Sequence, residues 1–76
     1  MEILQHGITG ELYAMQYRDG MTQALLSGVA GPLTTQEALR TIDSGEFPDG
    51  TEEDIEWALN QPWSEWRGEA LARADA

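Results

Sequence analysis

The sequence predicts a single α+β domain over residues 1–76, in which an N-terminal antiparallel β-hairpin packs with two or three short C-terminal helices. Three observations lead to this fold class. The dipeptide Asp19-Gly20 lies between two runs with partial apolar alternation, a helix-capping pattern follows Gly31-Pro32, and 41% of the residues are apolar. A chain of this length is expected to fold around one thin core.

The hairpin comes first in the chain. Glu11 to Arg18 and Met21 to Ser27 are its predicted strands, because two-residue type I′ turns favour Asp-Gly. With a two-residue loop, the apolar face of the ribbon pairs Tyr17 with Thr22, Met15 with Ala24 and Tyr13 with Leu26.

A strand around Glu2 to His6, turned by Gly7 and Gly10, can extend the hairpin to a three-stranded ribbon. The alternative is a small all-α bundle, since Ala, Met, Leu and Gln over 11–27 also favour short helices.

The helices follow Gly31-Pro32, which is expected to break the chain. Thr34 and Glu37 have the spacing of a capping box, in which each side chain accepts a backbone N–H of the other residue. The first helix is therefore predicted over about 35–43, with Ser44-Gly45 as its end.

A second helix is predicted over 52–60, capped by Thr51 and closed by Pro62. The helix dipole favours the acids in its first turn, which are Glu52, Glu53 and Asp54. A third helix is predicted over Ser64 to Ala74, with one stripe near Trp63, Trp66, Ala70 and Ala74.

The formal net charge is −10, from 14 acidic residues against 4 Arg and no Lys, a bias typical of a GC-rich gene. More than half of the acids lie between Arg40 and Arg67, an interval without a basic residue: Asp43, Glu46, Asp49, Glu52, Glu53, Asp54, Glu56 and Glu65. Such a run is ordinarily a solvated face that keeps a small protein soluble. Clustered like charges lower the stability of the folded protein. The functional interpretation is that this cost is retained because the negative surface is selected for binding.

Trp57 lies among these acids. On the wheel of the second helix, Ile55, Ala58 and Leu59 mark the expected buried stripe, and Trp57 is about 200° from Ile55. Either the third helix folds back over this indole, or Trp57 is an exposed anchor within an acidic rim.

Most chemistry has no support in the sequence, and no cofactor or metal is expected. There is no Cys, the single His6 cannot build a His-rich metal site, and no phosphate-binding glycine motif occurs. The calcium-loop spacing fails from Asp43, because Pro48 stands where a glycine is required. A nucleophile would have to be Ser27, Ser44 or Ser64 sharing His6, so we expect a non-enzymatic protein.

Charge and hydropathy also limit the partners. No apolar run approaches the roughly 20 residues that cross a bilayer, so a cytoplasmic protein is expected. A charge of −10 disfavours direct binding to nucleic acid or to anionic lipid. What is left is binding to another protein, as a monomer or a homodimer.

In size, acidity and compact mixed architecture the chain resembles small acidic proteins encoded by phages and other mobile elements, such as anti-CRISPR proteins and anti-restriction DNA mimics. The resemblance concerns the whole chain and implies inhibition of a basic nucleic-acid-binding defence complex. Carboxylates at helical spacing match the phosphate backbone in spacing and sign. The expected partner-binding residues are Asp43, Glu46, Asp49, Glu52, Glu53, Asp54, Glu56 and Trp57.

Two other functions are compatible with the sequence. One is a host adaptor or regulator that docks through its Trp-bearing C-terminal region, with the acids serving only solubility. The other is a small structural or assembly protein that becomes ordered in a homo-oligomer.

Overall fold

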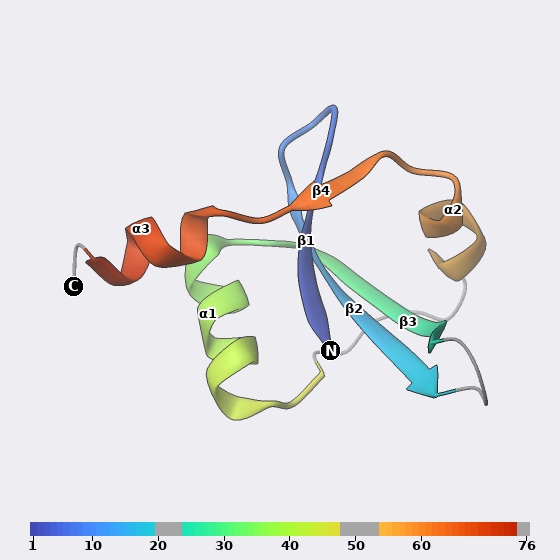
Figure 1. Cartoon of the computed structure of the whole chain (residues 1–76), viewed down its shortest axis with the longest axis horizontal. Helices are drawn as coiled ribbons and strands as arrows, with labels where there is room; N and C mark the ends of the chain where they lie inside the picture. The colour runs from blue at the N-terminus through green and yellow to red at the C-terminus, as the bar shows by residue number, and fades with distance from the viewer. Residues whose placement is uncertain (20–23, 48–53, 75–76) are drawn as a thin grey trace.

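The computed structural model describes residues 1–19, 24–47 and 54–74. The described chain forms an antiparallel sheet of four strands in the order β3-β2-β1-β4, with short helices on both sides of it (Figure 1). Its elements are β1 (Glu2–His6), β2 (Leu12–Asp19), β3 (Ala24–Leu33), α1 (Thr35–Ser44), α2 (Ile55–Leu59), β4 (Trp63–Glu65) and α3 (Gly68–Ala74). The α+β prediction is confirmed, and the all-α alternative is wrong.

The strand over Glu2–His6 is confirmed as β1, which pairs with β2 in the register Ile3 to Ala14 and Leu4 to Tyr13. The register of the β2–β3 hairpin differs from the prediction, because Asp19 pairs with Ala24 and leaves four residues between the strands. Tyr17 is therefore opposite Leu26 rather than Thr22, and Met15 is opposite Val29 rather than Ala24. Gly20, the second residue of the predicted turn, lies outside the described residues.

Strand β3 continues through Gly31-Pro32 to Leu33, so the predicted chain break at this dipeptide is wrong. Between the pairs Leu12–Leu33 and Ala14–Ala30, β3 has one residue more than β2. This β-bulge accommodates proline, which has no N–H to donate to the ladder, and the Gly31–Pro32 peptide bond is cis.

The core consists of two clusters on opposite faces of the sheet, because successive residues of a strand point to opposite faces. The first cluster joins Ala14 and its strand neighbours to Ala38 of α1, and its buried members are Ile3, Leu12, Ala14, Ala30 and Ala38. The second joins Met15 and Val29 to Ala58 of α2. The sequence predicted one apolar face, whereas β2 carries buried side chains on both.

Helix α1 begins and ends as predicted. Thr34 and Glu37 form both hydrogen bonds of the capping box, Glu37 N to Thr34 Oγ1 and Thr34 N to Glu37 Oε1, each at 3.1 Å. Gly45 ends the helix with φ 71°, a left-handed conformation that glycine adopts without a steric penalty.

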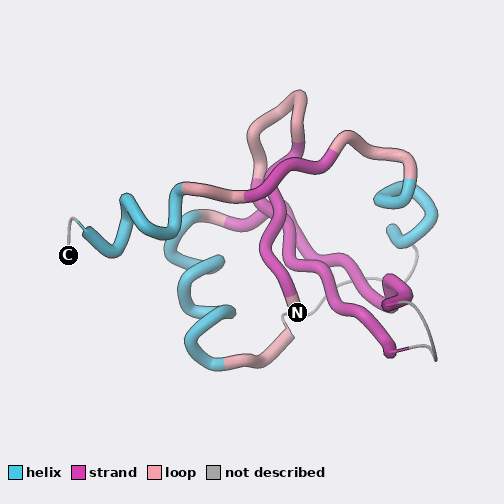
Figure 2. The backbone as a smooth tube through the Cα atoms, viewed as in Figure 1, coloured by secondary structure: helices cyan, strands magenta, loops and turns pink. Residues whose placement is uncertain are grey.

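Residues 63–65 form strand β4 instead of the start of a third helix. They pair with the outer edge of β1, His6 opposite Trp63, and Ser64 Oγ donates a hydrogen bond to Gln5 O. Trp63 thereby packs against the second cluster and Trp66 against the first, so the two indoles do not share a stripe. Helix α3 is limited to Gly68–Ala74 and lies near α1, as the tube in Figure 2 shows.

The hydrogen bonds of Thr34 lower the pKa of the Glu37 carboxyl below its ordinary 4.5. A carboxyl with a lower pKa in the folded state adds stability above its unfolded pKa, and this stability is lost as the pH falls through the folded pKa. We expect Glu37→Gln to flatten the loss of unfolding free energy below about pH 4.5, measured by urea denaturation across pH.

Thr34→Ala should lower the unfolding free energy at neutral pH by about 1 kcal/mol, whereas Thr34→Ser should retain the cap. If the unfolding free energy of Glu37→Gln falls at acid pH as steeply as that of the wild type, the result would contradict this role of the capping box.

Candidate functional site

Helix α2 places Trp57 on the face of the sheet that carries the second cluster. There, the rings of His6, Tyr13, Trp57 and Trp63 form an aromatic cluster. The Trp57 ring centroid lies 5.5 Å from that of Tyr13, 5.9 Å from that of Trp63 and 6.0 Å from that of His6. Even so, the Trp57 residue is 40% exposed. The covering groups come from the sheet, so the expectation that a third helix folds over this indole is wrong.

The orientation of α2 differs from the helical-wheel prediction. Ala58 is buried and Ile55 packs against the second cluster, as expected, but Leu59 is 69% exposed. The buried side of α2 is therefore centred on Ala58, with Ile55 and Trp57 on its flanks. The Trp63 indole determines this orientation in part, because its Nε1–H donates to Ala58 O at 2.7 Å.

His6 is the buried polar centre of the aromatic cluster, with 6% of its surface exposed. Its Nε2 lies 2.7 Å from Gln61 Oε1, and its Nδ1 accepts hydrogen bonds from the Ile8 and Thr9 backbone N–H groups. Because Nδ1 accepts, Nε2 carries the proton and donates to Gln61. Gln61 Nε2 in turn donates to Trp57 O at 3.3 Å, so His6 links β1 to the end of α2.

A hollow of about 280 Å³ opens beside Trp57 and is lined by Tyr13, Gly31, Asp54 and Trp57. Gly31 allows the Tyr13 ring to lie directly on β3, since a Cβ at this position would be 2.6 Å from Tyr13 Cδ2. Asp54 precedes α2, and its side chain makes no capping hydrogen bond to that helix. The hollow thus combines two aromatic rings with one carboxylate.

The electrostatics of this hollow are negative. The pKa of the Tyr13 phenol is raised above 10.0, first by burial and then by the charges of Glu11 and Asp54. The Glu56 side chain is exposed one residue before Trp57. Asp54 and Trp57 line the same hollow, and Glu56 is exposed next to Trp57 in the chain, so the exposed surface of these three predicted residues is called here the α2 face.

The other predicted acids lie elsewhere. Asp43 is at the end of α1, where its Oδ1 accepts from Arg73 Nη2 at 2.7 Å, and Arg73 also bonds to Glu69. Glu46 follows the C-cap of α1 and is exposed. Figure 1 shows α1 and α2 on opposite sides of the sheet, so the described acids do not form one continuous surface. Asp49, Glu52, Glu53 and the predicted cap Thr51 lie outside the described residues.

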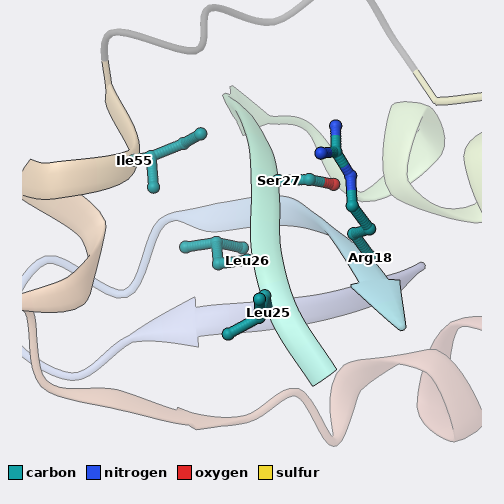
Figure 3. Close-up of a pocket in the computed structure, with 5 residues that line it drawn as sticks. All are labelled: Arg18, Leu25, Leu26, Ser27 and Ile55. Atoms are coloured by element: carbon teal, nitrogen blue, oxygen red, sulfur yellow. The ribbon is translucent and has the colours of Figure 1, made fainter. Parts of the chain in front are cut away.

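A second hollow of about 270 Å³ lies at β3 (Figure 3). In this view Leu26 and Ile55 are on one side of the strand, and Ser27 and Arg18 are on the other. Its side chains are mainly aliphatic, and among the five lining residues the charged one is Arg18. This hollow therefore does not extend the acidic α2 face.

The serine hydroxyls considered as nucleophiles donate to backbone carbonyls: Ser27 to Gln16 O, Ser44 to Thr41 O and Ser64 to Gln5 O. Within residues 1–19, 24–47 and 54–74, no group of three or more His, Asp or Glu side chains is placed to hold a metal ion. Helices in this part of the chain are too short or too polar to cross a membrane. The groups that the α2 face exposes are the Trp57 indole and the acidic side chains of Asp54 and Glu56.

The sequence identified Asp54, Glu56 and Trp57 but not the contribution of His6, Tyr13, Trp63 and Gly31. These residues come from β1, β2, β4 and β3, and their meeting depends on strand order and register. The sequence placed Tyr13 on the apolar face of the hairpin and Trp63 on a helix stripe, and no local signal indicated that the two rings meet at Trp57.

Comparison with protein-family models, with curated proteins and with solved structures finds no match.

His6→Ala removes the stacking on Trp57 and leaves Gln61 Oε1 and two backbone N–H groups without their partner. We expect a loss of about 2–4 kcal/mol of unfolding free energy and a red-shifted tryptophan emission. Ile8→Ala is the matched control, because Ile8 is 80% exposed on the adjoining turn and should change stability by less than about 0.5 kcal/mol. Equal stability of the two variants would refute the central role of His6.

The titration of Tyr13 tests the geometry of the hollow. In the Tyr17→Phe background, ultraviolet absorption should report a Tyr13 midpoint above 10.0, and Asp54→Asn should lower it. Because a raised pKa of an acid adds stability that is lost as the pH rises through the folded pKa, the protein should also lose stability in strong alkali. A midpoint insensitive to Asp54→Asn would place this carboxylate away from the ring.

Proposed function

We propose that this protein is a non-enzymatic inhibitor that binds a basic nucleic-acid-binding protein through the α2 face and excludes its nucleic acid. The observation that carries the proposal is Trp57, a large aromatic residue that is 40% exposed and follows two exposed acidic residues, Asp54 and Glu56, in the chain. Tryptophan is enriched in binding hot spots, which lie near the centre of an interface and are surrounded by a polar rim.

The charge supports the choice of partner. With a net charge of −10, the protein attracts a basic surface over distances of about 10 Å at moderate ionic strength and repels nucleic acid. A groove that binds phosphates offers Arg and Lys side chains at a spacing that carboxylates can satisfy. A phage or mobile-element origin and a target in host defence agree with the general resemblance of the chain to anti-CRISPR and anti-restriction proteins.

The rigidity of the α2 face supports binding. Trp57 is held by ring contacts with His6, Tyr13 and Trp63, so little side-chain entropy remains to be lost when a partner covers it. This arrangement makes the exposed indole a preorganised anchor rather than a loosely placed side chain.

A second candidate function is an adaptor that docks through apolar contact. The observation that favours it is Leu59, which is 69% exposed on the same helix as Trp57. An apolar interface persists at high salt, whereas association by charge weakens.

The test is capture by the tagged protein from lysate of a bacterium with a GC-rich genome, washed at low and at high salt. We expect a basic nucleic-acid-binding complex that is released by high salt and by added DNA or RNA. Asp54→Asn with Glu56→Gln should weaken binding of the purified target roughly two- to thirty-fold.

The matched control is Asp43→Asn with Glu46→Gln, which makes the same charge change on the α1 side and should bind as the wild type. Retention that is indifferent to salt and to nucleic acid would favour the adaptor. Loss of binding in the control alone would move the interface to the α1 side.

A further inference from the structure

We propose that the hollow beside Trp57, which Tyr13 and Asp54 also line, receives an arginine side chain of the protein partner. This inference rests on the proposed function, since the arginine belongs to the basic partner, and it names the group that the α2 face recognises. The lining residues are Tyr13, Gly31, Asp54 and Trp57.

The geometry of the hollow suits a flat cation. The Tyr13 and Trp57 rings have centroids 5.5 Å apart and planes inclined at 50°, and the hollow lies against both. The absence of a side chain at Gly31 lets the Tyr13 ring lie directly on β3, because a Cβ there would be 2.6 Å from Tyr13 Cδ2. The volume of about 280 Å³ is at the lower end of the roughly 300–1,000 Å³ typical of ligand pockets and can accommodate a single side chain.

The chemistry selects a cation over an anion or a neutral group. Aromatic faces carry partial negative charge, and a guanidinium within about 6 Å of a ring centroid is attracted to it. The Asp54 carboxylate contributes a full negative charge whose effect reaches the Tyr13 phenol, and the whole chain carries −10. An anionic ligand would meet repulsion from each of these groups.

Arginine is favoured over lysine because its planar guanidinium stacks on aromatic faces, is weakly hydrated and donates two parallel hydrogen bonds to a carboxylate. The lysine ammonium is a compact, strongly hydrated charge without a flat face. Both residues respond to the general negative field of the protein, so a preference for arginine reports stacking and paired hydrogen bonds rather than the field.

The hollow is formed before the partner arrives. His6 stacks on Trp57 with planes 18° apart, and Trp63 meets Trp57 and Tyr13 edge to face at 5.9 and 5.2 Å. The Trp63 indole also hydrogen-bonds to Ala58 O and fixes α2, which is too short to hold its own position. An arginine can therefore enter without a rearrangement of the rings.

The experiment compares two peptides of equal length and charge, one with arginines and one with lysines separated by glycines. Binding to the full chain is followed by tryptophan fluorescence and by NMR shifts of the Trp57 indole N–H. We expect the arginine peptide to bind roughly five- to thirty-fold more tightly and to shift this signal selectively.

Trp57→Leu should abolish the preference for arginine while lysine-peptide binding is retained, and Trp57→Phe, which keeps an aromatic face, should restore most of it. Leu71→Ala is the control for loss of an exposed apolar side chain on α3, and it should behave as the wild type. Circular dichroism checks that each variant is folded.

Equal affinity for the two peptides in the wild type, or an unchanged preference in Trp57→Leu, would overturn the arginine site. These outcomes leave the proposed function testable by itself. If binding of the captured target depends on Asp54 and Glu56 but not on Trp57, the result supports the charge-based inhibitor and contradicts the arginine site. If no basic partner is captured although the arginine peptide is preferred, the result contradicts the inhibitor function and supports the arginine site.

Discussion

The sheet buries both of its faces although the chain has only 76 residues, and the rest of the structure depends on this constraint. Each face receives one thin apolar cluster, and each cluster is completed by one alanine of a short helix, Ala38 of α1 or Ala58 of α2. A small side chain brings the helix backbone close to the strands. Neither cluster is large, so polar contacts at the edges of the sheet contribute more to holding the elements in place than they would in a larger domain.

His6 shows how such a polar contact acts. Its imidazole lies on the face of the sheet that carries the second cluster, and His6 is opposite Trp63 in the β1–β4 pair. The two ring nitrogens form hydrogen bonds with Gln61 and with the turn after β1. A buried imidazole with both nitrogens satisfied avoids the desolvation cost of an unpaired polar group. The same imidazole ring stacks on Trp57, so His6 also positions the exposed indole of the α2 face.

The distribution of charge gives the two sides of the sheet different characters. On the α1 side, Arg73 pairs with Asp43 and Glu69, which balances part of the acidic charge within the chain. On the α2 side, the carboxylates of Asp54 and Glu56 adjoin the exposed Trp57. The proposed recognition of a basic partner is therefore placed on the α2 face, where charge and aromatic surface coincide, and net charge alone would not have distinguished the sides.

The sequence by itself determined what depends on neighbouring residues: the capping box at Thr34, the left-handed Gly45, the strand character of the first half and the clustering of acids around Trp57. Tertiary structure decided the strand β4, the hairpin register, the two-sided core and the surroundings of Trp57. Caps are local because their donors and acceptors lie within four residues. Residues 63–65 become a strand through the edge of β1, which lies far away in the chain, and local patterns do not specify such a partner.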